Sequence, residues 1–249
     1  MEPQLNAPPI MPTIALIINL SLPDESGQNI EKPPVLARQI GNLGLAATWV
    51  IDGARQAKIL GQRLLATDTQ ELAVTTCARS PQRLRRELAD LQAAVQATSG
   101  HVVSMIVGDA QHLRAHTAVL ADLGFRAVVS NARPTETSRP ARLLPCGLWQ
   151  LDPAVTLPQP RHRWSLFPTR QLTVAQLFAT GSVSQPIALS VDPSRLSDRD
   201  LQGCQRLLQE IAEANRQQQL AVATVNDVVA QLVSQHEVKP QRSILRRAA

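Results

Sequence analysis

The sequence is poor in aromatic residues and cysteines, and its first hundred residues contain no histidine. Tyrosine is absent from the 249 residues, and aromatic side chains make up only 2% of the chain. A core must therefore be aliphatic, and platforms on which sugars or bases could stack are scarce. The 3 cysteines include no C-x-x-C pair. This pattern is typical of free thiols in a reducing compartment.

Two further absences concern targeting and membranes. The N-terminal residues lack the basic region followed by an apolar run that marks a secretory signal. No apolar stretch approaches the roughly 20 residues that span a bilayer. We therefore expect a cytoplasmic protein without a membrane span.

The net charge of the chain is positive, and much of it is concentrated at the C-terminal end. The net charge is +5, and in residues 236–249 four lysines and arginines face a single glutamate. We expect residues 1–11 to be a disordered N-terminus, residues 12–235 to form one domain, and residues 236–249 to be a basic tail. Such a tail could contact an acidic protein partner, whereas nothing in the sequence favours nucleic acid.

Apolar runs alternate with amphipathic segments along most of the chain, which predicts an α/β fold with a parallel sheet. The expected strands are 14–20, 46–51, 71–76, 102–107, 125–130, 186–191 and 220–223. The expected helices are 33–43, 54–65, 80–98, 109–124, 173–179, 196–217 and 225–233. Residues 131–170, rich in proline and arginine, break this rhythm and are predicted to be an irregular excursion over the surface. About seven strand–helix units imply a closed or nearly closed barrel.

Several passages occur in the order found in one known family. Ile14–Leu20 (IALIINL) resembles a strand ending in T-F-D-D, and Val35–Gly53 resembles a helix followed by A-T-F-F-v-x-G. Glu71 stands where the family reads G-H-E, Leu120–Val129 resembles its L-k-x-l-G-y-r-a-v passage, and Ile187–Asp192 resembles a late strand. The chain thus resembles the polysaccharide deacetylases (the NodB homology domain). The resemblance implies a distorted (β/α)7-type barrel of the glycoside hydrolase and deacetylase kind.

The resemblance also implies a metal site, and the residues at its positions depart from the family pattern. Enzymes of the family hold a divalent metal with one aspartate and two histidines, and a second aspartate acts as general base. Here the base and metal aspartates correspond to Asn19 and Leu20, the two metal histidines to Thr75 and Arg79, and the late histidine to Ser190. Leucine has no lone pair and arginine would repel a cation. We therefore expect no metal and no cofactor.

These departures favour a polysaccharide deacetylase-like protein without catalytic activity, which binds a saccharide or a partner protein at the strand ends. Two alternatives remain open: a hydrolase of N-acetyl groups with non-standard site residues, and an interaction subunit of a polysaccharide-related assembly. No catalytic residue is assigned. The predicted binding residues are Asn19, Asp24, Thr75, Arg79, Trp149 and Ser190.

Other clusters allow further interpretations. His112 and His116 are spaced i, i+4 and, with Asp109, could hold zinc, although two surface histidines on an ordinary helix explain the same spacing. The arginines at 79, 83, 85 and 86 could form an anion-binding rim or a solvated helix face.

The arginines between residues 133 and 170, around Trp149 and Trp164, could form a cationic lid or dock a protein partner. Arginines kept for solubility would give the same pattern. Pro145–Trp149 could plug the upper rim of the barrel.

Overall fold

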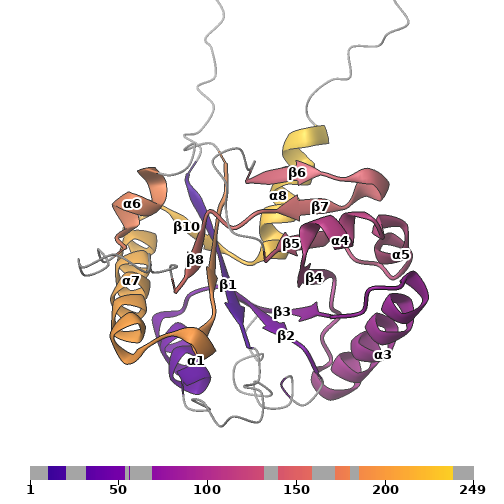
Figure 1. Cartoon of the computed structure of the whole chain (residues 1–249). Helices are drawn as coiled ribbons and strands as arrows, with labels where there is room; N and C mark the ends of the chain where they lie inside the picture. The colour runs from indigo at the N-terminus through magenta and orange to yellow at the C-terminus, as the bar shows by residue number, and fades with distance from the viewer. Residues whose placement is uncertain are drawn as a thin grey trace, which may run out of the picture.

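The protein is a curled, mostly parallel β-sheet whose outside is covered by α-helices (Figure 1). The structure, a computed structural model, describes residues 11–20, 32–53, 56, 69–131, 140–158, 172–179 and 185–237. Its strands are β1 (Thr13–Asn19), β2 (Ala47–Ile51), β3 (Gln70–Thr75), β4 (Met105–Gly108), β5 (Ala127–Ser130), β6 (Ala141–Leu143), β7 (Trp149–Leu151), β8 (Val155–Leu157), β9 (Ile187–Val191) and β10 (Ala221–Ala223). Its α-helices are α1 (Lys32–Leu43), α3 (Pro81–Ser99), α4 (Ala110–Arg114), α5 (Thr117–Asp122), α6 (Val174–Ala179), α7 (Asp198–Arg216) and α8 (Val225–Glu237).

The order of the strands makes the sheet curl. They follow the path β6-β7-β5-β4-β3-β2-β1-β9-β8, and β10 pairs with β1. Only residues 152–154 separate β7 from β8, which lie near opposite ends of this path. Because four residue steps span at most roughly 14 Å, the two edges of the sheet must come close together. The predicted α/β architecture, a distorted barrel of parallel strands, is confirmed.

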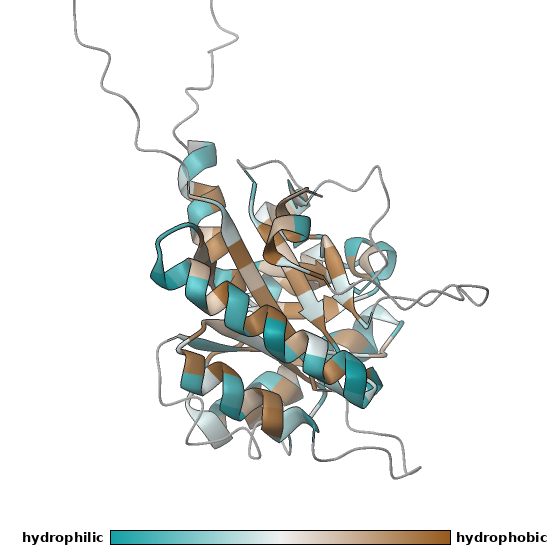
Figure 2. Ribbon diagram, turned by 90° about the vertical axis from the view of Figure 1, so that its left-hand side faces the viewer, coloured by the Kyte–Doolittle hydropathy of each residue, from teal (hydrophilic) through white to brown (hydrophobic). Residues whose placement is uncertain are grey.

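Alternate residues of the strands build the outer layer of the core. Ile14, Leu16 and Ile18 of β1 are buried in one cluster with Leu36 of α1 and Leu208 of α7. Each fully buried side chain of this size contributes about 1.5–3 kcal/mol. Figure 2 shows the outward side of α7 in hydrophilic colours and the strands behind it in hydrophobic ones. The amphipathic helices thus hold the outer face of the sheet.

The opposite face, which we call the inner face, is covered by α8. Strand β10 pairs with the first half of β1, with Thr13 opposite Ala221, whereas β2 pairs with its second half, with Asn19 opposite Val50. Helix α8 follows β10 directly and so begins within the curve of the sheet. The buried inner cluster includes Ala15 and Ile17 of β1 and, from α8, Val225, Val228 and Val229. Helix α8 therefore fills space inside the curl of the sheet.

The start of α3 follows the sequence signals. The Ser80 side chain accepts a hydrogen bond from the Arg83 amide, and Pro81 occupies the first turn. The helix ends at Gly100, whose φ of 75° is a left-handed conformation that glycine adopts without strain. The cap at Ser80 fixes the start of α3 directly after the loop that follows β3, and this loop carries the predicted site residue Arg79.

Two parts of the sequence prediction differ from the structure. The single helix expected over 109–124 is wrong: the chain forms α4 and α5, because His116, with φ −124° and ψ 24°, leaves the helical conformation between them. The excursion expected over 131–170 is also not irregular throughout, since residues 140–158 contribute β6, β7 and β8 to the sheet.

Other expected boundaries fall at the limits of the described residues. Apart from Gln56, the helix expected over 54–65 lies outside them, as do residues 1–10 and 238–249. His236 and Glu237, expected to begin the basic tail, still belong to α8. In the described part of the chain, no helix combines the length and the apolar character that crossing a membrane requires.

Candidate functional site

Three of the predicted binding residues lie near the carboxyl ends of β1, β3 and β9, which belong to the run β3-β2-β1-β9 of the sheet. Asn19 is the last residue of β1, Thr75 the last residue of β3, and Ser190 lies one position before the end of β9. The Asn19 Nδ2 donates a hydrogen bond of 2.9 Å to the Ser190 Oγ. The two side chains therefore meet across the β1–β9 pair. Asn19 and Thr75 are half-buried, while Ser190 is buried.

Leu20, predicted to replace the metal aspartate, turns away from these residues. Its side chain is 8% exposed and belongs to the outer cluster with Ile18 and Leu36. Its amide donates to the Val50 carbonyl at 2.9 Å, and its carbonyl accepts from the Gln56 Nε2 at 2.6 Å. Because both backbone groups are bonded, the segment is held with an apolar side chain packed into the core.

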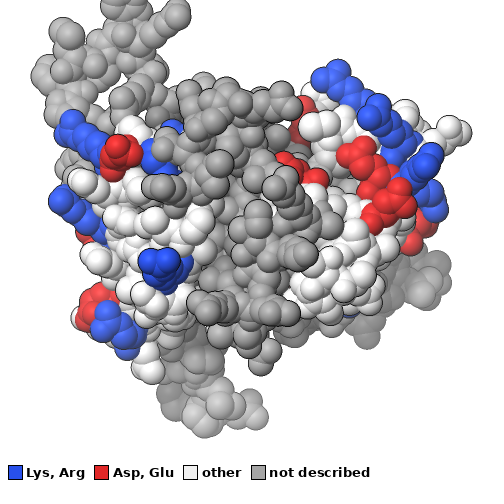
Figure 3. Space-filling model, turned by 90° about the horizontal axis from the view of Figure 1, so that it is seen from below, with Lys and Arg blue, Asp and Glu red and all other residues white. Residues whose placement is uncertain are grey.

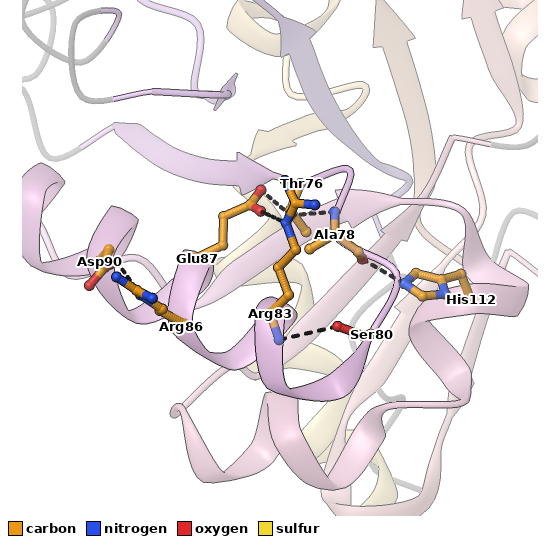
Figure 4. Close-up of polar contacts among 8 residues, drawn as sticks. All are labelled: Thr76, Ala78, Ser80, Arg83, Arg86, Glu87, Asp90 and His112. Carbon is orange, nitrogen blue, oxygen red and sulfur yellow. Dashed lines mark hydrogen bonds and ion pairs between the residues drawn. The ribbon is translucent and has the colours of Figure 1, made fainter.

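The loop after β3 is tied to its surroundings (Figure 4). The Thr76 Oγ1 donates to the Glu87 carboxylate and accepts from the Ala78 amide, and the Ala78 carbonyl lies 2.9 Å from the His112 Nε2. Arg79, in this loop, is exposed. Arg79, predicted to replace the second metal histidine, is thus a solvent-facing cation.

The histidine pair is brought together, although His112 lies in α4 and His116 lies outside it, directly before α5. The rings of His112 and His116 lie with their centroids 4.8 Å apart, edge to face. The His112 Nε2 is already engaged by the Ala78 carbonyl. Asp109 caps α4, and hydrogen bonds from the amides of His112 and Gln111 lower the pKa of its carboxyl group. Among the described residues, no three His, Cys, Asp or Glu side chains are grouped so as to hold a metal.

Two predicted residues are not part of this group. Trp149 is the first residue of β7 and pairs with Ala127, the first residue of the parallel strand β5. It therefore lies at the amino ends of the strands, where its ring contacts His236 of α8 at a centroid distance of 6.2 Å. A plug formed by Trp149 at the carboxyl rim is inconsistent with this placement. Asp24 lies outside the described residues.

Charged residues of both signs lie on α3 and the neighbouring α5, and Figure 3 shows both signs side by side on this side of the molecule. Arg85 pairs with Asp122 at 2.6 Å, and Arg83 and Arg86 each approach a carboxylate of the same helix at 3.9 Å. These three guanidinium groups therefore have carboxylate neighbours, as expected of a solvated helix face.

Glu71 has a position that sequence reasoning did not assign to any site. Its Oε2 accepts from the Thr48 Oγ1 and from the Asn226 amide, each at 3.1 Å, and the Val225 amide donates to the Thr48 Oγ1 at 3.0 Å. Glu71 thus caps the N-terminus of α8 inside the curl. Burial raises the pKa of its carboxyl group from the ordinary 4.5 to about 7, against the hydrogen bond from Asn226, which lowers it.

Comparison with known proteins gives a fold and no close relative. No protein-family model matches the sequence, and no curated protein matches it. A Mycobacterium smegmatis protein provisionally described as a polysaccharide deacetylase has a similar crystal structure, with a TM-score of 0.66 at 14% identity over 93% of this chain and 94% of that chain.

Two other solved structures resemble the chain more distantly. A family 4 acetyl xylan esterase from Clostridium thermocellum, in complex with a cobalt ion, gives a TM-score of 0.50 at 12% identity over 88% of this chain and 91% of that chain. A Bacillus anthracis pseudoenzyme of the CE4 family gives 0.53 at 12% identity over 89% and 66%. The resemblance indicated by the sequence is thus confirmed at the level of architecture: the chain has the polysaccharide deacetylase fold.

Proposed function

We propose that this chain is a polysaccharide deacetylase-like protein without metal-dependent hydrolytic activity, which binds a saccharide through neutral polar groups at the strand ends. The observation that carries the proposal is the Asn19–Ser190 hydrogen bond of 2.9 Å, next to a Leu20 side chain packed into the outer core. By the resemblance in sequence, Asn19 and Ser190 correspond to an aspartate and a histidine of the deacetylases, so an amide and a hydroxyl would replace a carboxylate and an imidazole.

The chemistry of these groups supports binding over hydrolysis. Activation of water by a divalent cation needs ligands with available lone pairs, and a leucine at the aspartate position provides none. Amide and hydroxyl groups can both donate and accept hydrogen bonds, as sugar hydroxyls do. The fold tolerates such a change, since the Bacillus anthracis protein that resembles this chain is itself a pseudoenzyme.

Metal binding is the first property to measure. We expect calorimetric titration of the purified protein with zinc and cobalt to give no stoichiometric tight binding, and we expect no acetate release from N-acetylated oligosaccharides. Tight binding of one ion together with metal-dependent acetate release would contradict the proposal and favour the alternative, a hydrolase with non-standard ligands. His112 and His116 would then be the first residues to replace.

Saccharide binding is tested separately on a panel of neutral and N-acetylated oligosaccharides. We expect Thr75→Val, which removes a hydroxyl with little change of volume, to weaken the binding of the best ligand about tenfold, because a polar ligand group would lose its partner. Thr98→Val is the matched control, since Thr98 is exposed and bonds to the Ala94 carbonyl of its own helix. Equal loss in both variants, or no saccharide bound by the wild type, would contradict this part of the proposal.

A further inference from the structure

A second cluster of polar residues lies on the side of β7 away from Trp149 and Leu151. Gln150, in the middle of the strand, is fully buried. Its Oε1 accepts hydrogen bonds of 2.9 Å from both the Arg114 Nε at the end of α4 and the Arg142 Nη2 on β6, and its Nε2 donates to the Asp152 Oδ1 at 2.5 Å. Helix α4 and strands β6 and β7 are drawn next to one another in Figure 1. Two cations therefore converge on one neutral oxygen.

This arrangement lacks a negative charge at its centre. Neither Arg114 nor Arg142 forms an ion pair with another residue in the described part of the chain, and Asp152, the nearest carboxylate of the cluster, is bonded to the amide. Both guanidinium groups are charged at any ordinary pH. The Arg142 Nε is buried without a hydrogen-bond partner. A buried donor without an acceptor is destabilising, as is the approach of two like charges.

We propose that Arg114 and Arg142, which Gln150 holds side by side, form a binding site for a single oxyanion, a phosphate or a carboxylate group. Guanidinium groups bind such groups with two parallel hydrogen bonds, and an anion between two of them would remove their repulsion. Arg114 is exposed and Arg142 half-buried, so the site opens to solvent on the side of α4. Rotation of the exposed Arg114 side chain would admit the anion and bring an acceptor to the Arg142 donors. The site is separate from the strand-end residues Asn19 and Ser190 and does not depend on their function.

Calorimetric titration with inorganic phosphate, acetate and glucuronate tests the proposal on the full chain. We expect at least one of these anions to bind with a dissociation constant of about 1 mM or lower. In Arg114→Gln we expect affinity to fall about tenfold or more, because charged hydrogen bonds are lost. Arg86→Gln, which removes an exposed arginine of α3, is the matched control and should bind like the wild type. Preference for phosphate indicates a phosphate ligand, and preference for glucuronate over acetate a carboxylate carried by a sugar.

Exchanging the positions of a carboxylate and an amide distinguishes anion binding at this specific site from general attraction of anions to a basic protein. The double variant Gln150→Glu with Asp152→Asn keeps the net charge and the hydrogen bond between the two side chains, and it moves the carboxylate onto the two arginines. We expect it to fold and to lose anion binding about tenfold or more, since an internal carboxylate replaces the ligand. The proposal is wrong if no probe binds the wild type, if Arg114→Gln binds like Arg86→Gln, or if the folded double variant binds anions as well as the wild type.

Discussion

Strand β3 carries two inner-face residues, four positions apart, with opposite characters. Glu71, near the start of the strand, is a carboxylate that caps α8, whereas Thr75, at its end, is a neutral hydroxyl, and both residues are half-buried. The carboxylate therefore lies near the start of β3, where it holds the first turn of α8, and a neutral polar group lies at the end of the strand. The charged residue thus has a structural role, while the strand end offers a hydroxyl group for hydrogen bonding.

The largest expected effect comes from breaking the packing of α8 on the inner face. Val228 is fully buried in that cluster, so Val228→Asp would place an unpaired carboxylate there. We expect a loss of about 4 kcal/mol or more in the free energy of unfolding, or no stable fold. Ala230→Asp, on the exposed side of the same helix, should change stability by less than about 1 kcal/mol. Urea unfolding measures both, and equal midpoints would refute the assignment of α8 to the interior.

The next largest effect concerns the dependence of the free energy of unfolding on pH. The ionisation of Glu71 should make the protein less stable as the pH rises. Because burial raises its pKa from 4.5 to about 7 in the folded chain, folding favours the protonated form. The associated stability is complete below about pH 4.5 and is lost as the pH rises through about 7, with a total on the order of 3 kcal/mol. Glu71→Gln, which stays neutral, should therefore be more stable than the wild type at pH 8 and should have a flatter profile.

Urea unfolding of both proteins between pH 5 and pH 8 measures this difference. Glu213→Gln, in the exposed turn at the end of α7, is the control and should keep the wild-type profile. Parallel profiles for the wild type and Glu71→Gln would mean that Glu71 ionises in the folded chain as freely as in water.

A smaller effect is expected at the strand ends. Asn19→Ala removes the donor to the Ser190 Oγ and should cost about 1 kcal/mol. The double-mutant cycle with Ser190→Ala should give a coupling energy of about 0.5–1.5 kcal/mol, since the two side chains bond to each other. Additive losses would show that the two side chains do not interact in solution.

The smallest effect is expected on the charged face of α3. The Arg86 Nε lies 3.9 Å from the Asp90 carboxylate, and the two side chains are 88% and 76% exposed. Arg86→Ala should therefore change the unfolding midpoint by an amount equivalent to less than about 0.5 kcal/mol. A loss above 1 kcal/mol would indicate that this face packs against something, and it would question its description as a solvated surface.

The parts of the fold that sequence predicts well are those with strong local patterns. Continuous apolar runs marked β1, β2 and β9 because both faces of these strands are buried. Ser80 and Pro81 marked the start of α3 because capping depends on adjacent residues. These signals give the order of strands and helices, from which the barrel follows.

The parts that sequence missed depend on distant contacts. Strands β6, β7 and β8 are three residues long, and a pattern that short is not detectable without the strands they pair with. Apolar spacing continues from Leu113 to Leu120, so the break at His116 has no apolar signal. The role of Glu71 depends on Asn226, and the two arginines bound to Gln150 come from separate elements. Asn19 and Ser190 could be proposed as binding residues from the sequence, whereas the hydrogen bond between their side chains could not.

The pairing of β1 with β10 affects how the protein folds while it is being synthesised. Thr13 lies opposite Ala221, and the helix that covers the inner face follows only after β10. While the chain is being made, the apolar inner sides of the strands must therefore wait for Val225, Val228 and Val229, which are synthesised after β1 to β9. Such delayed, long-range closure is slow and leaves intermediates prone to aggregation. A chain cut before Val225 should accordingly need a chaperone to stay in solution, because its inner cluster would lack Val225, Val228 and Val229 of α8.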